Sequence, residues 1–440
     1  MPNNHKGIWF IFLLPFAVAA ILCVQAVSTS GDTVPAPVFV SDNPQSIYAA
    51  DPNDSWNRIF RALFTRTVTH RVSDAFPEGA HFVPFRGPGL DPLSLRISKK
   101  KFSRTELGDR AIDPLYPTFF TIDGVLQVLS EPRFSDLTTA LREGIDERRT
   151  RSPVERALMQ ADAWAAYDIL YLRPVNGTPV SERRAKLLTL LRQFIRKLAL
   201  TNDEIESLQN NYLLAVNENK LPNMFSEETG WLEIEFIAHR LHDETASYRR
   251  AARVFVKPRT PPSDPGRFVE SLKNNQHHNQ VEAVALVIQN LLMDKTGRVV
   301  PSPLFSDVQF RFFKNDPKTS ATTAEPQQFE LSRRKLLTEP ASGGLVEISP
   351  TSPAYLSTAG NDYDFATPVE EAGASILVPL RARCTQCHGS SLTHLMTYSF
   401  HEFPSMPAVR ILKGQERALY VTRRKAERED FKSLSGIHTQ

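Results

Sequence analysis

Three side chains near the end of the chain constrain its fold and chemistry more than any other feature. Cys384, Cys387 and His388 stand in the order C-x-x-C-H, within the segment RARCTQCHG. On a helical turn, residues i, i+3 and i+4 share one face, so the two thiols and the imidazole would point to the same side. This arrangement can hold a planar group at one edge through two sulfurs and offer a nitrogen ligand to its centre.

A string of this kind is the attachment sequence of a c-type haem. The two thiols would form thioethers with the vinyl groups on one edge of the porphyrin, and His388 would be the proximal ligand of the iron. In this motif and its flanks the chain resembles c-type cytochromes. The resemblance implies one covalent haem c and the transfer of single electrons, and it does not extend to the long region before the motif.

Other readings of the cysteine pair remain open. Cys384 and Cys387 could form a disulfide with His388 incidental, or a thioredoxin-like pair, although no βαβ pattern surrounds them. They could also be half of a zinc site, but no second close cysteine pair follows. The chain has only three cysteines, the third being Cys23, which excludes a disulfide framework.

The distal ligand of the haem is predicted to be Met406, in the segment FPSMP. This methionine–proline pair resembles the methionine loop of class I cytochromes, and a thioether ligand would raise the reduction potential. His401, a histidine from the upstream region and an open position are the alternatives. Only 52 residues follow His388, which is cramped for an independent cytochrome fold, so the upstream region is expected to help build the pocket.

Two further groups of residues are weaker candidates. Glu235, His239 and His242 would line up on a helix as a metal face, but the segment WLEIEF reads equally well as a strand, which would break that alignment. Arg381 and Arg383 could pair with haem propionates or simply begin a solvated helix. No hydrolase, zinc-protease or phosphate-loop pattern appears, so catalytic residues are unknown.

Residues 1–26 have the three parts of a secretory signal peptide. Lys6 precedes an uncharged apolar run from Ile8 to Val24, and small residues at Val24 and Ala26 suit cleavage by a signal peptidase. An uncleaved membrane anchor and lipid attachment at Cys23 are the alternatives. Every version places the folded protein outside a bacterial cytoplasm, in the periplasm or secreted, and an uncleaved segment would associate it with a membrane.

The remaining pattern predicts an α+β protein. A Pro-rich extended region is expected over 27–110, a helical domain over 111–220 and a mixed, strand-containing region over 221–350. A mainly helical, cytochrome c-like haem-binding segment is expected over 351–440. Alternating apolar residues in DVQFRFFK indicate a strand, and a turn is expected before it at Asp294–Gly297.

Two segments predict helices with an apolar stripe. In SPVERALMQADAWAAYDILYL the stripe is Leu158, Ala161, Ala165, Ile169 and Leu172, and in SERRAKLLTLLRQFIRKLAL it is Leu187, Leu190, Leu191, Phe194 and Leu198. Ser152 with Glu155 and Thr201 with Glu204 are expected helix starts of the capping-box kind.

Three functions are compatible with these observations. The first is an exported electron carrier that exchanges single electrons with an exported redox partner. The second is a haem enzyme or sensor, peroxidase- or oxidase-like, with an open distal site. The third is a non-haem interaction protein with a Cys384–Cys387 disulfide. The formal net charge of +3 gives no reason to expect nucleic acid as a partner.

Overall fold

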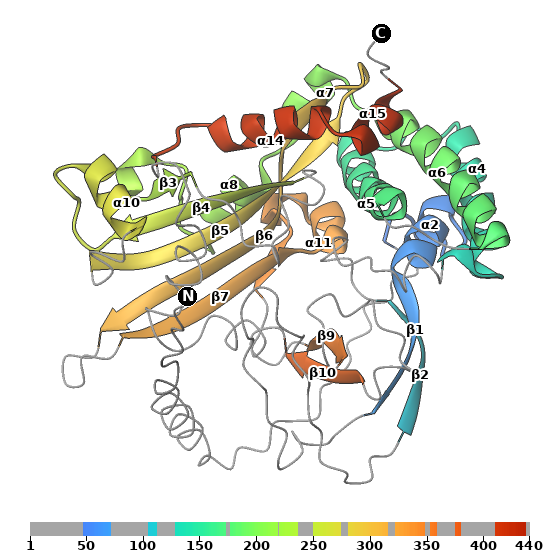
Figure 1. Cartoon of the computed structure of the whole chain (residues 1–440), viewed down its shortest axis with the longest axis horizontal. Helices are drawn as coiled ribbons and strands as arrows, with labels where there is room; N and C mark the ends of the chain where they lie inside the picture. Colours follow the sequence, from blue (N-terminus) through green and yellow to red (C-terminus); the bar gives the residue numbers. More distant parts are fainter. Residues whose placement is uncertain are drawn as a thin grey trace, which may run out of the picture. The chain divides into compact units, whose positions relative to one another are not determined.

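The computed structural model describes residues 47–71, 104–111, 128–172, 177–218, 220–235, 250–273, 280–315, 322–347, 353–358, 375–379 and 410–436. All of them belong to one compact unit. They combine helices with a six-stranded antiparallel sheet, which confirms the predicted α+β class (Figure 1). The predicted signal segment, residues 1–26, lies outside the described residues.

The sheet is a meander in which each strand pairs antiparallel with the next one along the chain. Its order is β3-β4-β5-β6-β7-β8, with bounds Leu232–Ile234, Arg250–Pro258, Val281–Met293, Val299–Asn315, Thr322–Leu331 and Leu345–Glu347. The turn between β5 and β6 falls at Asp294–Gly297, as the sequence predicts. Gly297 has a φ of 81° and donates its N–H to the Asp294 carbonyl at 2.9 Å, a conformation that glycine adopts without strain.

The two faces of the sheet differ in chemistry. Val287, Val308 and Phe329 stand opposite one another on β5, β6 and β7, and all three side chains belong to the main hydrophobic core or line it. Because side chains alternate along a strand, Asp307 and Gln309 project from the opposite face. They too are almost fully buried, at 3% and 7% exposure.

Helices pack beside this sheet, some of them against its strands and the others against neighbouring helices. They are α2 Ser55–Phe64, α4 Arg133–Asp146, α5 Pro153–Leu172, α6 Thr178–Leu198, α7 Asn202–Glu206 and α8 Asn211–Asn217. Two starts carry the capping box that their sequences predict. Ser152 and Glu155 exchange hydrogen bonds before α5, as do Thr201 and Glu204 before α7.

One predicted apolar stripe is confirmed, and the other is confirmed only in part. On α6 the predicted residues are all buried: Leu187, Leu190, Leu191, Phe194 and Leu198. The predicted α5 stripe holds in part: Leu158 and Ala165 are buried, Ala161 and Ile169 are half-buried, and Leu172 is 40% exposed. Polar Gln160, Asp162 and Asp168 are buried on the same helix. The reason is that α5 is a central helix, which contacts α2 and α6 as well as β5, α11 and α15.

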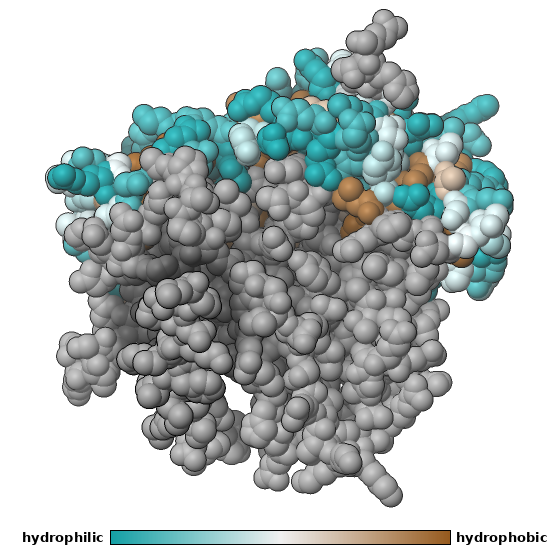
Figure 2. All heavy atoms as spheres, in the orientation of Figure 1, coloured by the Kyte–Doolittle hydropathy of each residue, from teal (hydrophilic) through white to brown (hydrophobic). Residues whose placement is uncertain are grey.

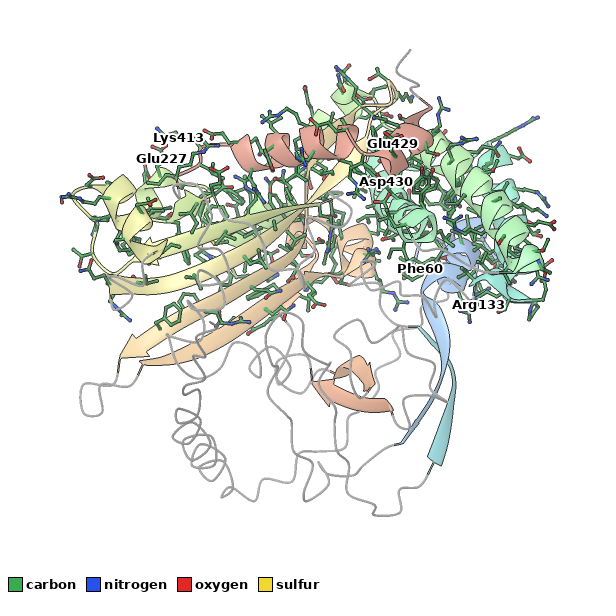
Figure 3. All side chains as sticks on the ribbon, in the orientation of Figure 1. Phe60, Arg133, Glu227, Lys413, Glu429 and Asp430 are labelled. Atoms are coloured by element: carbon green, nitrogen blue, oxygen red, sulfur yellow. The ribbon has the colours of Figure 1, made fainter. Side chains whose placement is uncertain are left out.

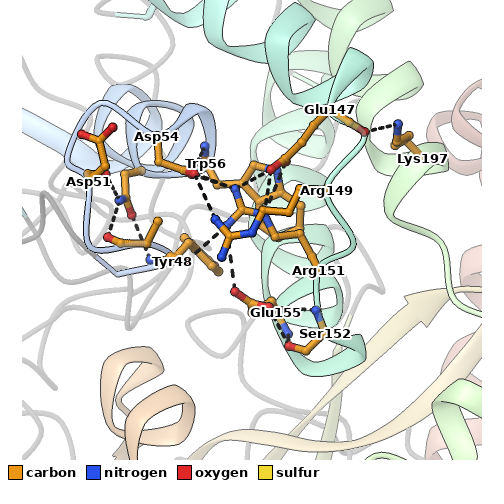
Figure 4. A network of polar contacts seen from close by, with 12 residues as sticks. Tyr48, Asp51, Asp54, Trp56, Glu147, Arg149, Arg151, Ser152, Glu155 and Lys197 are labelled. Carbon is orange, nitrogen blue, oxygen red and sulfur yellow. Dashed lines mark hydrogen bonds and ion pairs between the residues drawn. The ribbon is translucent and has the colours of Figure 1, made fainter.

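A buried arginine joins the segment before α2 to the α4–α5 connection (Figure 4). Arg151 is 2% exposed in its side chain, and its Nη2 donates to Asp54 at 2.7 Å and to Glu147 at 2.8 Å. Its guanidinium also lies 4.6 Å from the ring centroid of Trp56. The predicted extended region therefore contains α2 and contributes to the core. Trp56, Ile59, Phe60 and Leu63 recur at helical spacing in a stretch without proline between Pro52 and Pro77.

The chain's other described elements are short. They are β1 Thr65–Arg71 paired with β2 Arg104–Ala111, β9 Pro353–Thr358 paired with β10 Ser375–Pro379, α10 Pro265–Lys273, α11 Arg333–Thr338, α14 Glu416–Ala426 and α15 Glu429–Ser435. Helix α14 packs on β4, β5 and β6, and α15 packs on α5 and α6. Among the described helices, none combines the length and apolar character needed to cross a bilayer.

The visible surface along α14, α15 and α6 is mostly hydrophilic (Figure 2). Leu419 and Tyr420, at 46% and 39% exposure, are the two large apolar side chains that α14 leaves outside. On its buried side α14 packs Ala418 and Val421 on Ala251 and Leu291 of the sheet, next to the buried polar residues Arg417, Thr422 and Lys425. The C-terminal helices are therefore part of the described core.

Candidate functional site

The predicted haem ligands lie outside the described residues. Cys384, Cys387 and His388 fall between β10, which ends at Pro379, and Arg410, where the described chain resumes. Met406 falls in the same interval, together with the weaker candidates His401, Arg381 and Arg383. The structure describes the chain again from Arg410, together with the strands and helices that residues 410–436 contact. We call these strands and helices the scaffold.

That scaffold begins with a backbone pairing at the sheet edge. Ile411 forms an antiparallel bridge with Ile234 of β3. Glu235 donates its N–H to the Arg410 carbonyl at 2.8 Å, and Leu412 donates its N–H to the Glu233 carbonyl, also at 2.8 Å. Arg410 also holds Glu235 through a side-chain ion pair of 2.6 Å. The chain that leaves the motif thus joins the sheet as a short seventh strand-like segment beside β3.

The carboxylate of Glu235 is therefore in an ion pair in the described scaffold. Its neighbours Leu232–Ile234 form strand β3, so the WLEIEF segment is a strand over those residues. The predicted helical alignment of Glu235 with His239 and His242 is interrupted at this end, while the two histidines lie outside the described residues. Among the described residues, no group of three or more potential metal ligands comes together.

A buried arginine stands behind this edge. Arg253 of β4 is 1% exposed, and its guanidinium donates to both carboxylate oxygens of Glu233, at 2.8 and 2.5 Å. It also donates to the side-chain oxygen of Gln289 at 3.2 Å and to the carbonyl of Gly414. The rings of Phe225 and Phe255 flank it, with centroids 4.5 and 5.8 Å away. Arginine suits this site because its planar fork can satisfy several acceptors at once.

A second buried cluster fixes α14 and α15 to α5. The Lys425 ammonium has no exposed surface and donates to Asp168 at 2.8 Å and to Asp430 at 3.1 Å. The indole of Trp164 donates to the other oxygen of Asp168 at 3.1 Å, and Arg428 shares Asp430. Figure 3 shows Asp430 on α15 and Lys413 at the far end of the α14 segment, so the two buried clusters hold this segment near its two ends.

Asp307, a buried carboxyl group on the face of the sheet opposite the main core, has a raised pKa. Asp307 accepts hydrogen bonds from Gln309 at 2.7 Å and from Gln328 at 3.3 Å, and Gln328 also donates to Glu330 at 3.0 Å. Burial raises the pKa of Asp307 from its ordinary value of 3.8 to about 6, although these hydrogen bonds and the charges of Arg250 and Arg311 act in the other direction. Such a carboxyl can take up or release a proton close to neutral pH.

This raised pKa predicts a pH dependence of stability. The folded state binds the Asp307 proton more tightly than the unfolded chain does, so protonation favours folding. The contribution of Asp307 to the free energy of unfolding should therefore fall by about 2 kcal/mol as pH rises from about 4 to about 7, most of it below the folded pKa of about 6. Denaturant titrations of the wild type and of Asp307→Asn across this range isolate the contribution, because the variant cannot ionise there.

As pH rises, the free energy of unfolding of the wild type should fall relative to that of Asp307→Asn. Asp146→Asn, at an exposed position on α4, is the matched control and should leave the pH profile of the wild type unchanged. A wild-type-minus-variant difference that stays constant between pH 4 and pH 7 would contradict the assignment.

Sequence reasoning did not find these three buried polar groups. Alternation in DVQFRFFK identifies the strand, but a polar residue at every second position reads as a solvent-facing side. For Arg253 and Lys425 there is no local signal, because their partners lie up to 161 and 257 residues away in the sequence. Comparison with protein-family models, curated proteins and solved structures gives no match, so function has to be argued from this chain's own residues.

Proposed function

We propose that the chain is an exported c-type cytochrome that carries one covalent haem and transfers single electrons. The observation that carries this proposal is the string Cys384-Thr-Gln-Cys387-His388, which supplies two tethers and one iron ligand within five residues. A neutral imidazole from His388 suits haem iron on the proximal side. The donor set therefore fits the group.

Each residue of the proposed site has a distinct role. Cys384 and Cys387 would hold the porphyrin by thioether bonds, and His388 would be the proximal ligand. Met406 would be the distal ligand, where a thioether raises the reduction potential. Arg381 and Arg383 would pair with the propionates through their guanidinium groups. When bound, haem iron supplies a one-electron couple, and the surrounding protein tunes it by burial and hydrogen bonding.

The anchored segment after the motif supports a role for Met406. Arg410 is fixed to the sheet edge by its carbonyl and by its ion pair with Glu235. Arg410 is four positions after Met406, and an extended chain of four residues spans at most about 14 Å. A haem with Met406 as its ligand would therefore lie near the β3 edge, so the upstream sheet would contribute to its surroundings.

Export is part of the same proposal. Residues 1–26 would direct the chain out of a bacterial cytoplasm, to the periplasm or beyond, where haem attachment and exchange with an exported redox partner would take place. The electron carrier is preferred over a haem enzyme or sensor because Met406 offers a second ligand within reach of the motif. An open distal site remains the alternative function.

The test uses the full chain exported in a host with a working c-type haem maturation system. Intact mass should exceed that of the processed polypeptide by one haem, and a denaturing gel stained for haem should show the band. The reduced optical spectrum should be low-spin, and the oxidised one should carry a methionine–iron charge-transfer band. A high-spin spectrum that shifts with carbon monoxide would instead establish the open-site enzyme or sensor. A mass lower than the bare chain by two hydrogens would establish the disulfide.

A further inference from the structure

We propose that Arg253 is a positioning residue. It fixes the C-terminal end of the ligand-carrying segment, which runs from Cys384 to Gln415, against the sheet and so sets the environment of the haem. The haem part of this inference rests on the proposed function. The structural part concerns only described residues: Arg253, Glu233, Gln289 and the corner at Gly414–Gln415.

Burial and hydrogen bonding show how firmly the guanidinium is held. Arg253 is 1% exposed and its partner Glu233 is 7% exposed, and the pair is bidentate. A buried ion pair of this kind is costly to desolvate and becomes favourable only when its geometry is good and its remaining donors are satisfied. Here the remaining donors reach Gln289 and the Gly414 carbonyl. The guanidinium thus connects β3, β4 and β5 to the segment that follows the motif.

The corner at Gly414 is held from two sides. Its carbonyl accepts from Arg253, and the next side chain, Gln415, accepts from the amide of Gln289 at 3.2 Å. That amide also donates to the Ser302 carbonyl at 2.8 Å, which ties the corner to β6. Gly414 has a φ of +57°, a conformation that a residue with a Cβ adopts only with strain, and nothing lies within 4 Å of where that Cβ would be.

These contacts act on one short stretch of chain. Backbone pairing with β3 holds Arg410–Leu412, and the Arg253 cluster holds Gly414 and Gln415. Met406 is four positions before Arg410, and His388 is 22 positions before it. Loosening the corner would let the end of the ligand-carrying segment move relative to the sheet. That movement would admit water to the haem or weaken the distal bond, and either change alters the reduction potential.

We call the contacts of Arg253 and Gln289 with Gly414 and Gln415 the clamp. Two variants of the full-length protein test it in different ways. Arg253→Lys keeps the charge but loses the planar fork that serves several acceptors. Gly414→Ala leaves Arg253 and Glu233 in place and strains only the corner. Each has a matched control elsewhere in the fold. Arg333→Lys disrupts another buried bidentate pair, formed with Asp162, and Gly177→Ala strains another glycine with positive φ and open space around it.

The deciding measurement is the reduction equilibrium of the haem, alongside the unfolding midpoint. Arg253→Lys should change the equilibrium constant for one-electron reduction at least tenfold, equal to about 59 mV, and weaken the methionine–iron band. Gly414→Ala should change it in the same direction. Arg333→Lys and Gly177→Ala should lower the unfolding midpoint and leave the equilibrium constant for reduction within twofold of the wild-type value. Equal shifts of potential in Arg253→Lys and Arg333→Lys would overturn the inference.

Amide hydrogen exchange tests the clamp without reference to haem. The N–H groups of Glu235 and Leu412 make the two pairing bonds, so they report on the sheet edge directly. Both should exchange at least tenfold faster in Arg253→Lys than in Arg333→Lys. If the wild type carries no haem, the proposed function fails and this comparison still decides the clamp. Equal exchange at these two amides in both variants would overturn it.

Discussion

Replacing Cys384 and Cys387 together by serine is expected to give a protein with no covalently attached haem. Thioether formation requires a sulfur at each position, and a serine hydroxyl does not add to the vinyl groups in its place. Haem staining after denaturing electrophoresis should be lost completely, and the intact mass should equal that of the processed polypeptide. Each single variant should retain at most one tether, with a changed reduced spectrum.

The matched control for that experiment is Cys23→Ser, the third cysteine of the chain. It lies in the predicted signal segment, so full haem content is expected after its replacement. Covalent haem in the double variant would refute the proposed attachment site. Loss of haem in Cys23→Ser alone would show that the export segment, rather than the motif, limits maturation.

Replacing Lys425 by methionine is expected to lower the free energy of unfolding by about 3–5 kcal/mol. The ammonium lies between Asp168 and Asp430 with no exposed surface, so the substitution leaves two buried carboxylates without their shared cation. Methionine fills a similar volume, which keeps the cavity contribution small. Urea titration followed by circular dichroism measures the change.

Lys432→Met is the control for the Lys425 variant, because it removes a lysine from the adjacent helix whose ion pair with Glu429 lies at the surface. Its effect should stay within about 1 kcal/mol, as for other surface pairs. Adding Asp168→Asn to Lys425→Met should recover part of the loss, since it removes one of the two buried carboxylates that lose the ammonium and retains an acceptor for Trp164. Equal effects of Lys425→Met and Lys432→Met would contradict the buried network.

Local sequence signals predicted the elements of this fold well, and their packing less well. The capping boxes at Ser152 and Thr201 and the turn at Asp294–Gly297 depend on neighbours within a few residues, so they could be read directly. The stripe of α6 could also be read, because one side of that helix faces water. Helix α5 could not, because neighbours on several sides bury polar and apolar positions alike.

The same distinction applies to the candidate sites. The C-x-x-C-H string places all its chemistry within five residues, so it predicts attachment without knowledge of the fold. The clusters around Arg253, Lys425 and Asp307 exist only when distant strands and helices meet, and their individual residues look like ordinary surface charges in the sequence. The contacts that hold residues 410–415 against the sheet were therefore visible only in the structure.

The C-terminal helices also govern how the fold can form. Lys425 binds Asp168 across 257 residues, and the Tyr167 hydroxyl binds Ser433 across 266. Contacts of such long range are slow to form, because a large loss of chain entropy precedes any gain from the contact. A truncated chain that stops before residue 410 would lack the partner strand of β3 and the lysine of the buried cluster. We therefore expect the segment that contains the C-x-x-C-H string to be inseparable from its scaffold, so that it could not be produced as a small autonomous domain.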